Sequence, residues 1–188
     1  MHLVLIADTF PPQRTSGAVQ LRDLTREFIR QGHFVSVILP TSSQIENWSM
    51  ENFEGAQVLR LKVPRFKDVG KIRRAFAEVL MPYYMYKNFK KGPLASNKWE
   101  AVIWYSPSIF HGPFVCALKQ NRELVSYLII RDIFPEWAVD VGLMKRGLSY
   151  IFFKSFANLQ YSLADVIGVQ TIGNKKYFYD WIKSHGRK

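Results

Sequence analysis

Short, continuously apolar runs alternate with amphipathic segments along the chain. The first run, LVLIA at residues 3–7, is apolar at every position, as expected of a strand buried on both faces of a parallel sheet. Similar patterns predict further strands at residues 34–39, 57–63, 101–105, 124–130 and 166–169. Helical spacing predicts a helix after the opening loop and others near residues 70–91, 110–121, 145–163 and 174–184. Strands alternating with helices predict an α/β fold with a Rossmann-like, doubly wound, mostly parallel sheet.

The length of 188 residues fits one well-buried domain, and no Ser/Gly-rich linker divides residues 1–188. Thr15 or Ser16 is predicted to cap the first helix, and Gly32 to end it in a left-handed conformation. Only Cys116 is present, so an internal disulfide is excluded. The chain carries 26 Lys and Arg against 15 Asp and Glu, a net charge of +11, which favours anionic partners without choosing among them.

In doubly wound sheets ligands bind beyond the carboxyl ends of the strands, so the loops there are the candidate sites. The first loop lies within ADTFPPQRTSGAVQ, residues 7–20, and contains neither GxGxxG nor a Walker A motif. Gly17 at a helix start can hold an anion, and Arg14 can add a bidentate phosphate contact. The alternative is that Gly17 only allows the helix to pack closely and that Arg14 is solvated.

Two further loops carry reactive side chains. The loop after the fifth strand contains Arg131, Asp132 and Glu136. In a functional interpretation these side chains form an ion pair, an acid–base group or an anion clamp. In the structural alternative they form only a salt bridge beside a helix that begins at Pro135. After the fourth strand, Ser106 is a turn residue by type. His111 is a ligand, a base or a structural histidine. No His/Cys set has metal-ligand spacing, so no protein-held metal is predicted.

The segment 65–91 contains eight Lys or Arg residues against Asp68 and Glu78, interleaved with aromatic residues. This composition is typical of an interfacial helix on anionic lipid, and Pro82 predicts that it is split into two short helices. A core helix with a solvated basic face is the alternative. No nucleic-acid partner is predicted, because no DNA- or RNA-binding motif accompanies the patch. The predicted membrane contacts are Lys71, Arg73, Arg74, Tyr83, Tyr84, Lys87 and Lys90.

The opening strand and its Gly17 loop, QGHFVSVILP at residues 31–40 and RDIFPEWAVDVGL at residues 131–143 resemble family 4 glycosyltransferases. The closer resemblance is to bacterial enzymes that build lipopolysaccharide O-antigen and capsule chains and transfer N-acetyl-fucosamine-type sugars. The resemblance implies the GT-B fold, in which two Rossmann-like domains face each other across a cleft. It implies that this chain is the N-terminal, acceptor-side domain and that the nucleotide-sugar domain is missing from it.

The same resemblance implies a retaining transfer from a nucleotide-sugar, a UDP-sugar by type, to a lipid-pyrophosphate-linked sugar. No cofactor is expected on this domain, and the domain alone is expected to be inactive. The expected location is cytoplasmic and peripheral, at the inner face of an anionic membrane. Gly17 would lie near the donor phosphates, with Ser16 in place of a second glycine. Ser106 and His111, which follow the predicted strand at residues 101–105, are further candidates for binding the substrate.

Arg131 stands where many relatives have a histidine near the transferred sugar. Because arginine stays protonated, it would bind phosphate or hydroxyl groups and could not act as a base. Asp132 and Glu136 would accept hydrogen bonds from an acceptor hydroxyl. Trp181 and Tyr179 are expected to be exposed, where they would pack on the second domain or join two copies as a homodimer.

Other functions are compatible with a Rossmann core. The chain could be a non-catalytic binding or assembly module, or half of a split enzyme. An epimerase acting on UDP-sugars would need a YxxxK-like pair and a glycine-rich fingerprint. The stretch YYMYK at residues 83–87 places Tyr83 four residues before Lys87, but no glycine-rich fingerprint follows the first strand, so this function is not favoured.

Overall fold

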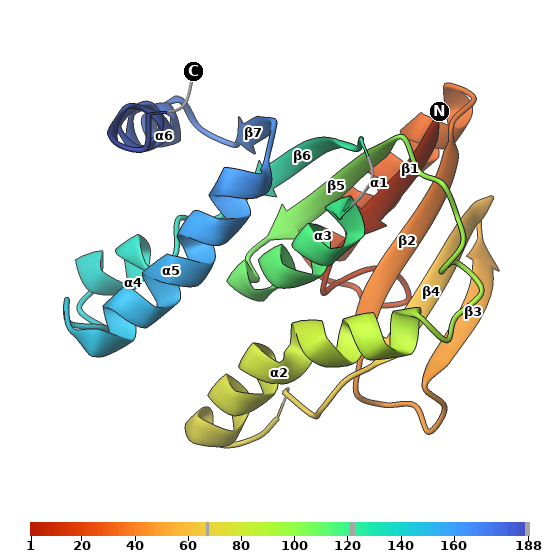
Figure 1. Cartoon of the computed structure of the whole chain (residues 1–188), viewed down its shortest axis with the longest axis horizontal. Coiled ribbons are helices and arrows are strands. Elements are labelled where there is room, and N and C mark those ends of the chain that lie inside the picture. Colours follow the sequence, from red (N-terminus) through yellow and green to blue (C-terminus); the bar gives the residue numbers. More distant parts are fainter. Residues whose placement is uncertain (67, 121–122, 187–188) are drawn as a thin grey trace.

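The computed structural model describes residues 1–66, 68–120 and 123–186, and its centre is a seven-stranded sheet (Figure 1). The strand order is β3-β4-β2-β1-β5-β6-β7, and every neighbouring pair is parallel except β3 and β4. Without β3 this is the Rossmann order, so the predicted doubly wound fold is confirmed. The strands are β1 (His2–Ile6), β2 (Phe34–Thr41), β3 (Trp48–Phe53), β4 (Ala56–Lys62), β5 (Ala101–Ser106), β6 (Val125–Ile130) and β7 (Val166–Val169).

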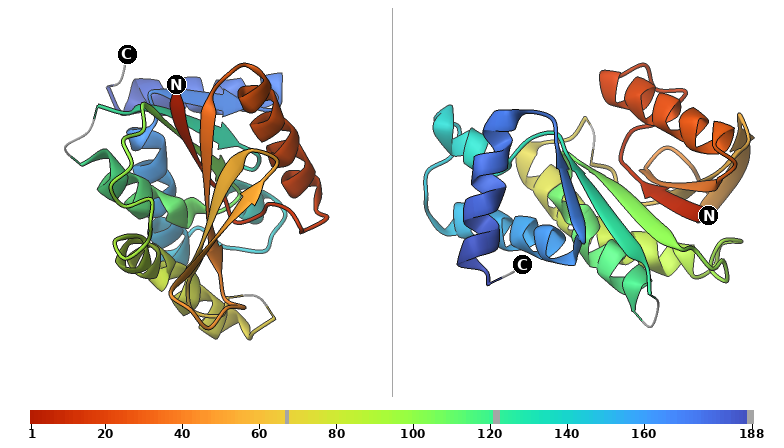
Figure 2. Two further views of the ribbon diagram at one scale, coloured as in Figure 1. Left: turned by 90° about the vertical axis from the view of Figure 1, so that its right-hand side faces the viewer. Right: turned by 90° about the horizontal axis from the view of Figure 1, so that it is seen from above.

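Helices cover both faces of the sheet, which explains the continuously apolar strands (Figure 2). α1 (Ser16–Arg30) lies on one face, and α2 (Lys71–Phe89), α3 (Gly112–Lys119) and α5 (Leu148–Leu163) lie on the other. The short α4 (Glu136–Asp140) precedes α5, and α6 (Ile172–Ser184) follows β7. A single turn of 3-10 helix, η1 (Ile109–His111), leads into α3.

The predicted boundaries of α1 are confirmed. Thr15 is the N-cap, and its hydroxyl accepts a hydrogen bond from the Ala18 N–H at 3.2 Å. Gly32 follows the helix with φ +82°, a conformation that favours glycine.

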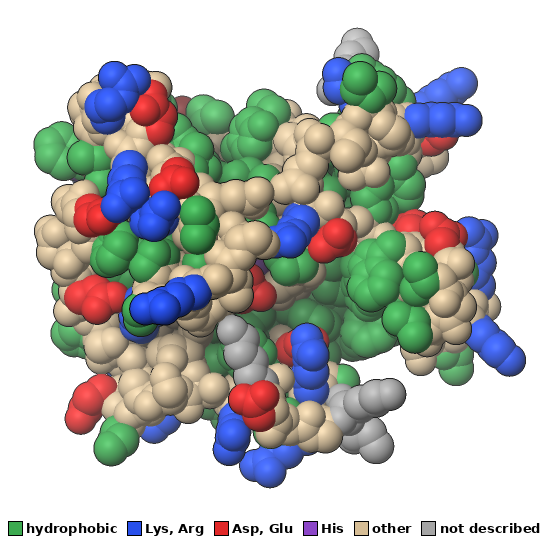
Figure 3. All heavy atoms as spheres, turned by 180° about the vertical axis from the view of Figure 1, so that it is seen from behind, with side chains coloured by type: hydrophobic (Ala, Val, Ile, Leu, Met, Phe, Trp, Pro, Cys, Tyr) green, Lys and Arg blue, Asp and Glu red, His purple; other side chains and the backbone are tan. Residues whose placement is uncertain are grey.

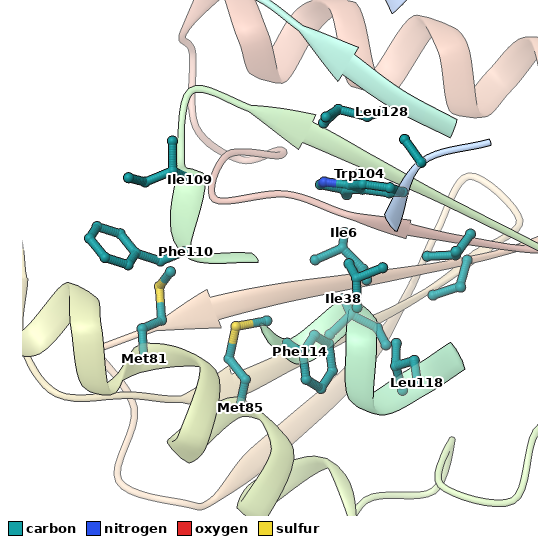
Figure 4. Close-up of a cluster of buried hydrophobic side chains, with 14 of the residues drawn as sticks. Ile6, Ile38, Met81, Met85, Trp104, Ile109, Phe110, Phe114, Leu118 and Leu128 are labelled. Atoms are coloured by element: carbon teal, nitrogen blue, oxygen red, sulfur yellow. The ribbon is translucent and has the colours of Figure 1, made fainter. Parts of the chain in front are cut away.

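The prediction that Pro82 splits the segment after β4 is wrong, because α2 continues through it. Ala77, Met81, Met85 and Phe89 lie on one face of α2 and are buried in the core. In Figure 4 the side chains of Met81 and Met85 point toward residues of the sheet and of η1 and α3. Burial on both sides of the proline offsets the one backbone hydrogen bond that it removes.

One strand was not predicted, and one short helix was expected only under the structural alternative for its loop. β3 is an edge strand with mostly exposed residues, so it lacks an apolar face; it forms a hairpin with β4 through Glu54 and Gly55, both at positive φ. α4 has only five residues and begins directly after Pro135, in agreement with the structural alternative for that loop.

The prediction of exposed aromatic residues near the C-terminus is only partly right. Tyr179 is exposed, but Trp181 is buried against Tyr161, with ring centroids 5.5 Å apart. Its indole N–H donates to Asn158 Oδ1 at 2.9 Å, which fixes α6 to α5.

Candidate functional site

A pocket of about 530 Å³ opens at the carboxyl edge of the sheet. It lies where the order of the parallel strands reverses, between the ends of β1 and β5, which is the usual place for ligands in this fold. Segments after β1, β4, β5 and β6 and the N-terminal half of α2 form its walls. The lining residues are Asp8, Phe66, Asp68, Arg74, Glu78, Met81, Pro107, Ser108, Ile109, Phe110, Asp132, Phe134 and Trp137.

Carboxylates and aromatic rings dominate this pocket. Four acidic residues line it but only one basic residue, Arg74, whose Nε donates to Glu78 Oε1 at 2.7 Å. Asp132 is exposed, and Asp8 Oδ1 is buried with no hydrogen-bond partner among the described residues. Trp137 keeps 43% of its surface exposed although it lines the pocket. Such a lining suits a ligand that has many hydroxyl groups and a flat ring face.

The loop after β1 approaches the end of β6 beside this pocket. The guanidinium of Arg131 donates from Nη1 to the Tyr105 hydroxyl and from Nη2 to Ser16 Oγ, each at 3.2 Å. The bond to Tyr105 raises the pKa of Arg131 above its usual value, so the side chain stays charged. A Cβ on Gly17 would lie 3.1 Å from Thr9 and 3.3 Å from the Tyr105 ring. Gly17 therefore serves close packing between α1 and the sheet.

Arg14 faces a different hollow. Phe10 is fully buried, and Arg60 donates to the Pro11 carbonyl at 2.6 Å, so the loop is fixed toward β4. Arg14 lines a small pocket of about 200 Å³ beside Arg22, and it is not among the residues that line the carboxyl-edge pocket.

Glu136 does not line the pocket either. Its carboxylate forms an ion pair with Lys154 and accepts hydrogen bonds from the hydroxyls of Tyr177 (2.9 Å) and Tyr150 (3.3 Å). Burial raises the pKa of Tyr177, so its hydroxyl stays protonated and can donate. These contacts join α4, α5 and α6 through Oε1, whereas Oε2 of Glu136 is buried with no hydrogen-bond partner among the described residues.

Ser106 and His111 do not line the pocket, although the residues between them from Pro107 to Phe110 do. Both are buried, and the Ser106 hydroxyl and both His111 ring nitrogens have no hydrogen-bond partner among the described residues. The side-chain amide of Gln160 on α5 is buried in the same way, and Gly112 next to His111 packs on Gln160. Burial lowers the pKa of His111, and the nearby Asp8 carboxylate raises it by a smaller amount. The imidazole is therefore neutral near pH 7.

This burial predicts a pH dependence of stability. The unfolded chain takes up a proton at His111 near pH 6.5, whereas the folded chain resists it, so stability is present above that pH and is lost as the pH falls. The loss should reach about 1.4 kcal/mol per pH unit for this one proton. Urea unfolding between pH 8 and pH 5 measures it, and His111→Gln should have a smaller slope. An equal slope in the variant would rule out His111 as the source.

Four of the seven predicted membrane contacts, Arg73, Tyr83, Lys87 and Lys90, lie on the outer side of α2. Phe76, Leu80 and Tyr83 are exposed at 67, 46 and 60% and follow each other at helical spacing, so they form one stripe opposite the buried face. Arg73 extends this stripe at one end, and Lys87 and Lys90 extend it at the other. Arg74 faces the pocket, Tyr84 is half-buried beside Lys87, and the side chain of Lys71 lies outside the described part. The buried face of α2 agrees with the alternative of a core helix, and contact of its basic, aromatic outer face with a membrane stays a prediction.

Sequence reasoning missed Asp8, Asp68, Glu78 and Trp137 as pocket residues. Asp8 had the clearest signal, since it follows the first strand by two residues. Among the described residues no group of three or more His, Cys, Asp or Glu side chains could hold a metal ion. In that same part, no helix combines the length and apolarity needed to cross a membrane.

Comparison with known proteins supports the fold. No family model matches the chain, and no curated protein matches it. Among solved structures, sucrose-phosphate synthase from Thermosynechococcus elongatus is similar at a TM-score of 0.68 and 11% identity, over 96% of this chain and 45% of that protein. The UDP-forming trehalose-phosphate synthase from Burkholderia xenovorans, in complex with glucose-6-phosphate, is similar at a TM-score of 0.67 and 12% identity, over 98% of this chain and 43% of that protein.

A structure of trehalose-6-phosphate from E. coli bound with UDP-2-fluoro glucose gives a TM-score of 0.61 at 10% identity, over 98% of this chain and 43% of that one. The chain therefore spans less than half the length of each of these proteins. Together they confirm the predicted Rossmann-like half of a GT-B fold.

Proposed function

We propose that this chain is the acceptor-binding half of a retaining glycosyltransferase that takes a sugar from a nucleotide-sugar donor. The observation that carries the proposal is the carboxyl-edge pocket, which is acidic and aromatic in a chain of net charge +11. Its carboxylates can accept hydrogen bonds from sugar hydroxyls, and Trp137 offers an exposed ring face for a sugar ring.

The same charges argue against the donor diphosphate as the occupant of this pocket. Asp8, Asp68 and Asp132 would repel a diphosphate, and Arg74 is already paired with Glu78. The donor therefore needs cationic or amide groups from a second half. The UDP-sugar analogue in the E. coli structure, a protein of about twice the length, supports a UDP-sugar as donor.

In this proposal Asp132 and Asp8 orient the acceptor sugar by accepting hydrogen bonds from two of its hydroxyl groups, one each. Arg131 remains a cation held by Ser16 and Tyr105 beside this pocket, and we propose that it binds a phosphate or hydroxyl group there. Stabilisation of the departing diphosphate, the largest electrostatic demand of such a reaction, belongs to the other half.

For the acceptor we propose a lipid-pyrophosphate-linked glycan of surface polysaccharide synthesis, as in the family 4 enzymes of O-antigen and capsule assembly, with hexosyl or N-acetylaminosugar transfer. α2 supports this choice because its inner side lines the pocket through Arg74, Glu78 and Met81 while its outer stripe is apolar and basic. If the stripe rests on a membrane, the sugar of a lipid-linked acceptor in that membrane would lie near α2 and could enter the pocket beside it. The proposed location is the cytoplasmic face of an anionic membrane.

The test of this function is transfer by the chain alone and after a nucleotide-sugar half is supplied. We expect no turnover from the chain alone and turnover of radiolabelled UDP-sugar onto a lipid-pyrophosphate sugar once both halves are present. Full activity of the isolated chain would contradict the division of labour. Binding without turnover in any combination would instead favour a non-catalytic assembly module.

The α2 stripe gives a separate prediction. Replacing Phe76, Leu80 and Tyr83 together by serine should weaken partition onto vesicles containing phosphatidylglycerol by about tenfold or more, because about 0.8 kcal/mol is lost per buried CH₂ equivalent. Vesicle co-sedimentation measures the change. A matched control replaces three exposed apolar residues elsewhere, Val125, Val166 and Ile172, by serine. Equal loss in both triple variants would show that the stripe has no special role.

A further inference from the structure

A second pocket, of about 480 Å³, lies between the C-terminal half of α2 and the end of β4. It is separate from the carboxyl-edge pocket and shares no lining residue with it. Three of its lining residues are lysines, and no carboxylate lines it. Its polar lining consists of Asn47, Lys62, Tyr84, Lys87, Asn88 and Lys91. We propose that this pocket binds a phosphate group, as a phosphomonoester or phosphodiester.

The frame of this lysine pocket is fixed by backbone hydrogen bonds. The Lys62 N–H donates to the Asn47 carbonyl at 3.0 Å, and the Val63 N–H donates to the Thr41 carbonyl at 2.8 Å. Asn88 is buried, with 4% of its surface exposed, and its Nδ2 donates to the Lys62 carbonyl at 2.6 Å. α2 and the end of β4 are thereby held together, so the pocket does not have to be assembled by its ligand.

The lysine charges are not neutralised within the described part of the chain. No ion pair there involves Lys87 or Lys91, and the Lys62 ammonium donates to the Ile45 carbonyl at 2.6 Å. Lys87 Nζ lies 6.0 Å from the centre of the Tyr84 ring. A cluster of ammonium groups without carboxylates attracts a phosphate dianion, and lysine is a common phosphate ligand.

The basic residues of α1 give the contrast. Arg22 pairs with Asp23, Arg26 with Glu54 and Arg30 with Glu27. In Figure 3, which shows the molecule from behind, blue and red side chains accordingly stand next to each other on the side that holds α1. The lysine pocket is a place where the excess positive charge is concentrated without such partners, so an anion there meets no competing carboxylate in the lining.

The phosphate could belong to a lipid headgroup or to a soluble compound. Lys87 lies both on the rim of this pocket and at the end of the α2 stripe, so a headgroup beneath the stripe would place its phosphate here. A free sugar phosphate or inorganic phosphate presents the same chemistry. The site does not depend on the proposed sugar transfer, because it is tested without donor or acceptor.

The test is titration of the 188-residue chain with inorganic phosphate, by calorimetry, at fixed ionic strength. The variant K87Q/K91Q should bind phosphate at least tenfold more weakly than the unchanged chain. The control K175Q/K176Q removes the same charge from exposed positions on α6 and should change the affinity less than twofold. Thermal unfolding of each protein verifies that it is folded. Equal weakening in both variants, an unchanged K87Q/K91Q or no binding by the parent chain would overturn the site.

Vesicles then separate the two sources. Glycerol 3-phosphate should displace the chain from phosphatidylglycerol vesicles if the pocket holds a headgroup, and K87Q/K91Q should lose this displaceable fraction. Phosphate binding that leaves vesicle binding unaffected assigns the pocket to soluble phosphate esters. Both results support the phosphate site, whereas failure of phosphate binding rejects it whatever the vesicles show.

Discussion

Replacing Asp8 and Asp132 together by asparagine should lower transfer to the acceptor by at least about 100-fold in the two-half enzyme. Both side chains line the carboxyl-edge pocket, and asparagine keeps their shape while removing the charge. A hydrogen bond to a charged group contributes about 1.5–3 kcal/mol, so each single change should cost roughly 10- to 100-fold. The two effects need not add, because both carboxylates would contact one acceptor.

The measurement is kcat/KM for the acceptor at saturating UDP-sugar. The matched control is Asp180→Asn, which changes an exposed carboxylate on α6 and should leave the rate unaffected. The KM for the donor should also stay constant, since the acidic pocket does not hold the diphosphate. If D8N/D132N raised the donor KM and left acceptor kinetics unchanged, the pocket would be wrongly assigned.

Replacing Trp104 by alanine should lower the free energy of unfolding by about 3–5 kcal/mol. Trp104 is a fully buried side chain on β5, packed in the larger core cluster (Figure 4). The change removes a bicyclic ring at the sheet centre, where surrounding strands cannot collapse into the space.

The variant Trp104→Phe separates the effect of lost side-chain volume from the effect of the buried indole N–H. The indole N–H of Trp104 is buried with no hydrogen-bond partner among the described residues, so phenylalanine removes an unpaired donor while it keeps an aromatic ring. We expect a cost of about 1–2 kcal/mol for this change. The control Trp137→Ala, at a half-exposed ring, should cost about 1 kcal/mol or less. Urea unfolding with a constant m-value measures all three; equal costs for the alanine and phenylalanine variants at residue 104 would contradict the packing argument.

The parts of the fold that local pattern determines could be predicted from the sequence. Continuously apolar strands and helical periodicity gave the alternation of elements, and Thr15 and Gly32 marked the ends of α1. The hairpin strand β3 has no buried face, so periodicity carried no signal for it. The local rule that proline breaks helices predicted a break at Pro82, but the packing of Met81 and Met85 outweighs that rule, and such packing is visible only in three dimensions.

The site was less predictable because side-chain partners are distant in sequence. Glu136 looked like a ligand for substrate, but Lys154 and Tyr177, on two later helices, bind one of its carboxylate oxygens. Arg131 was expected at the reacting edge, and the structure does bring it to Ser16, 115 residues earlier in the chain. Trp137 could be read from sequence only as a packing residue, since nothing local shows that its ring faces a pocket.

The central claim is that this chain binds the acceptor and not the donor. Titration of the folded chain with a lipid-pyrophosphate-linked sugar and, separately, with a UDP-sugar tests it most directly, with the fluorescence of Trp137 as the local reporter and Trp137→Phe as its control. We expect saturable binding of the acceptor, with a Trp137 signal that D8N/D132N abolishes, and no binding of the UDP-sugar at the same concentrations. Saturable UDP-sugar binding with no response to the acceptor would contradict it.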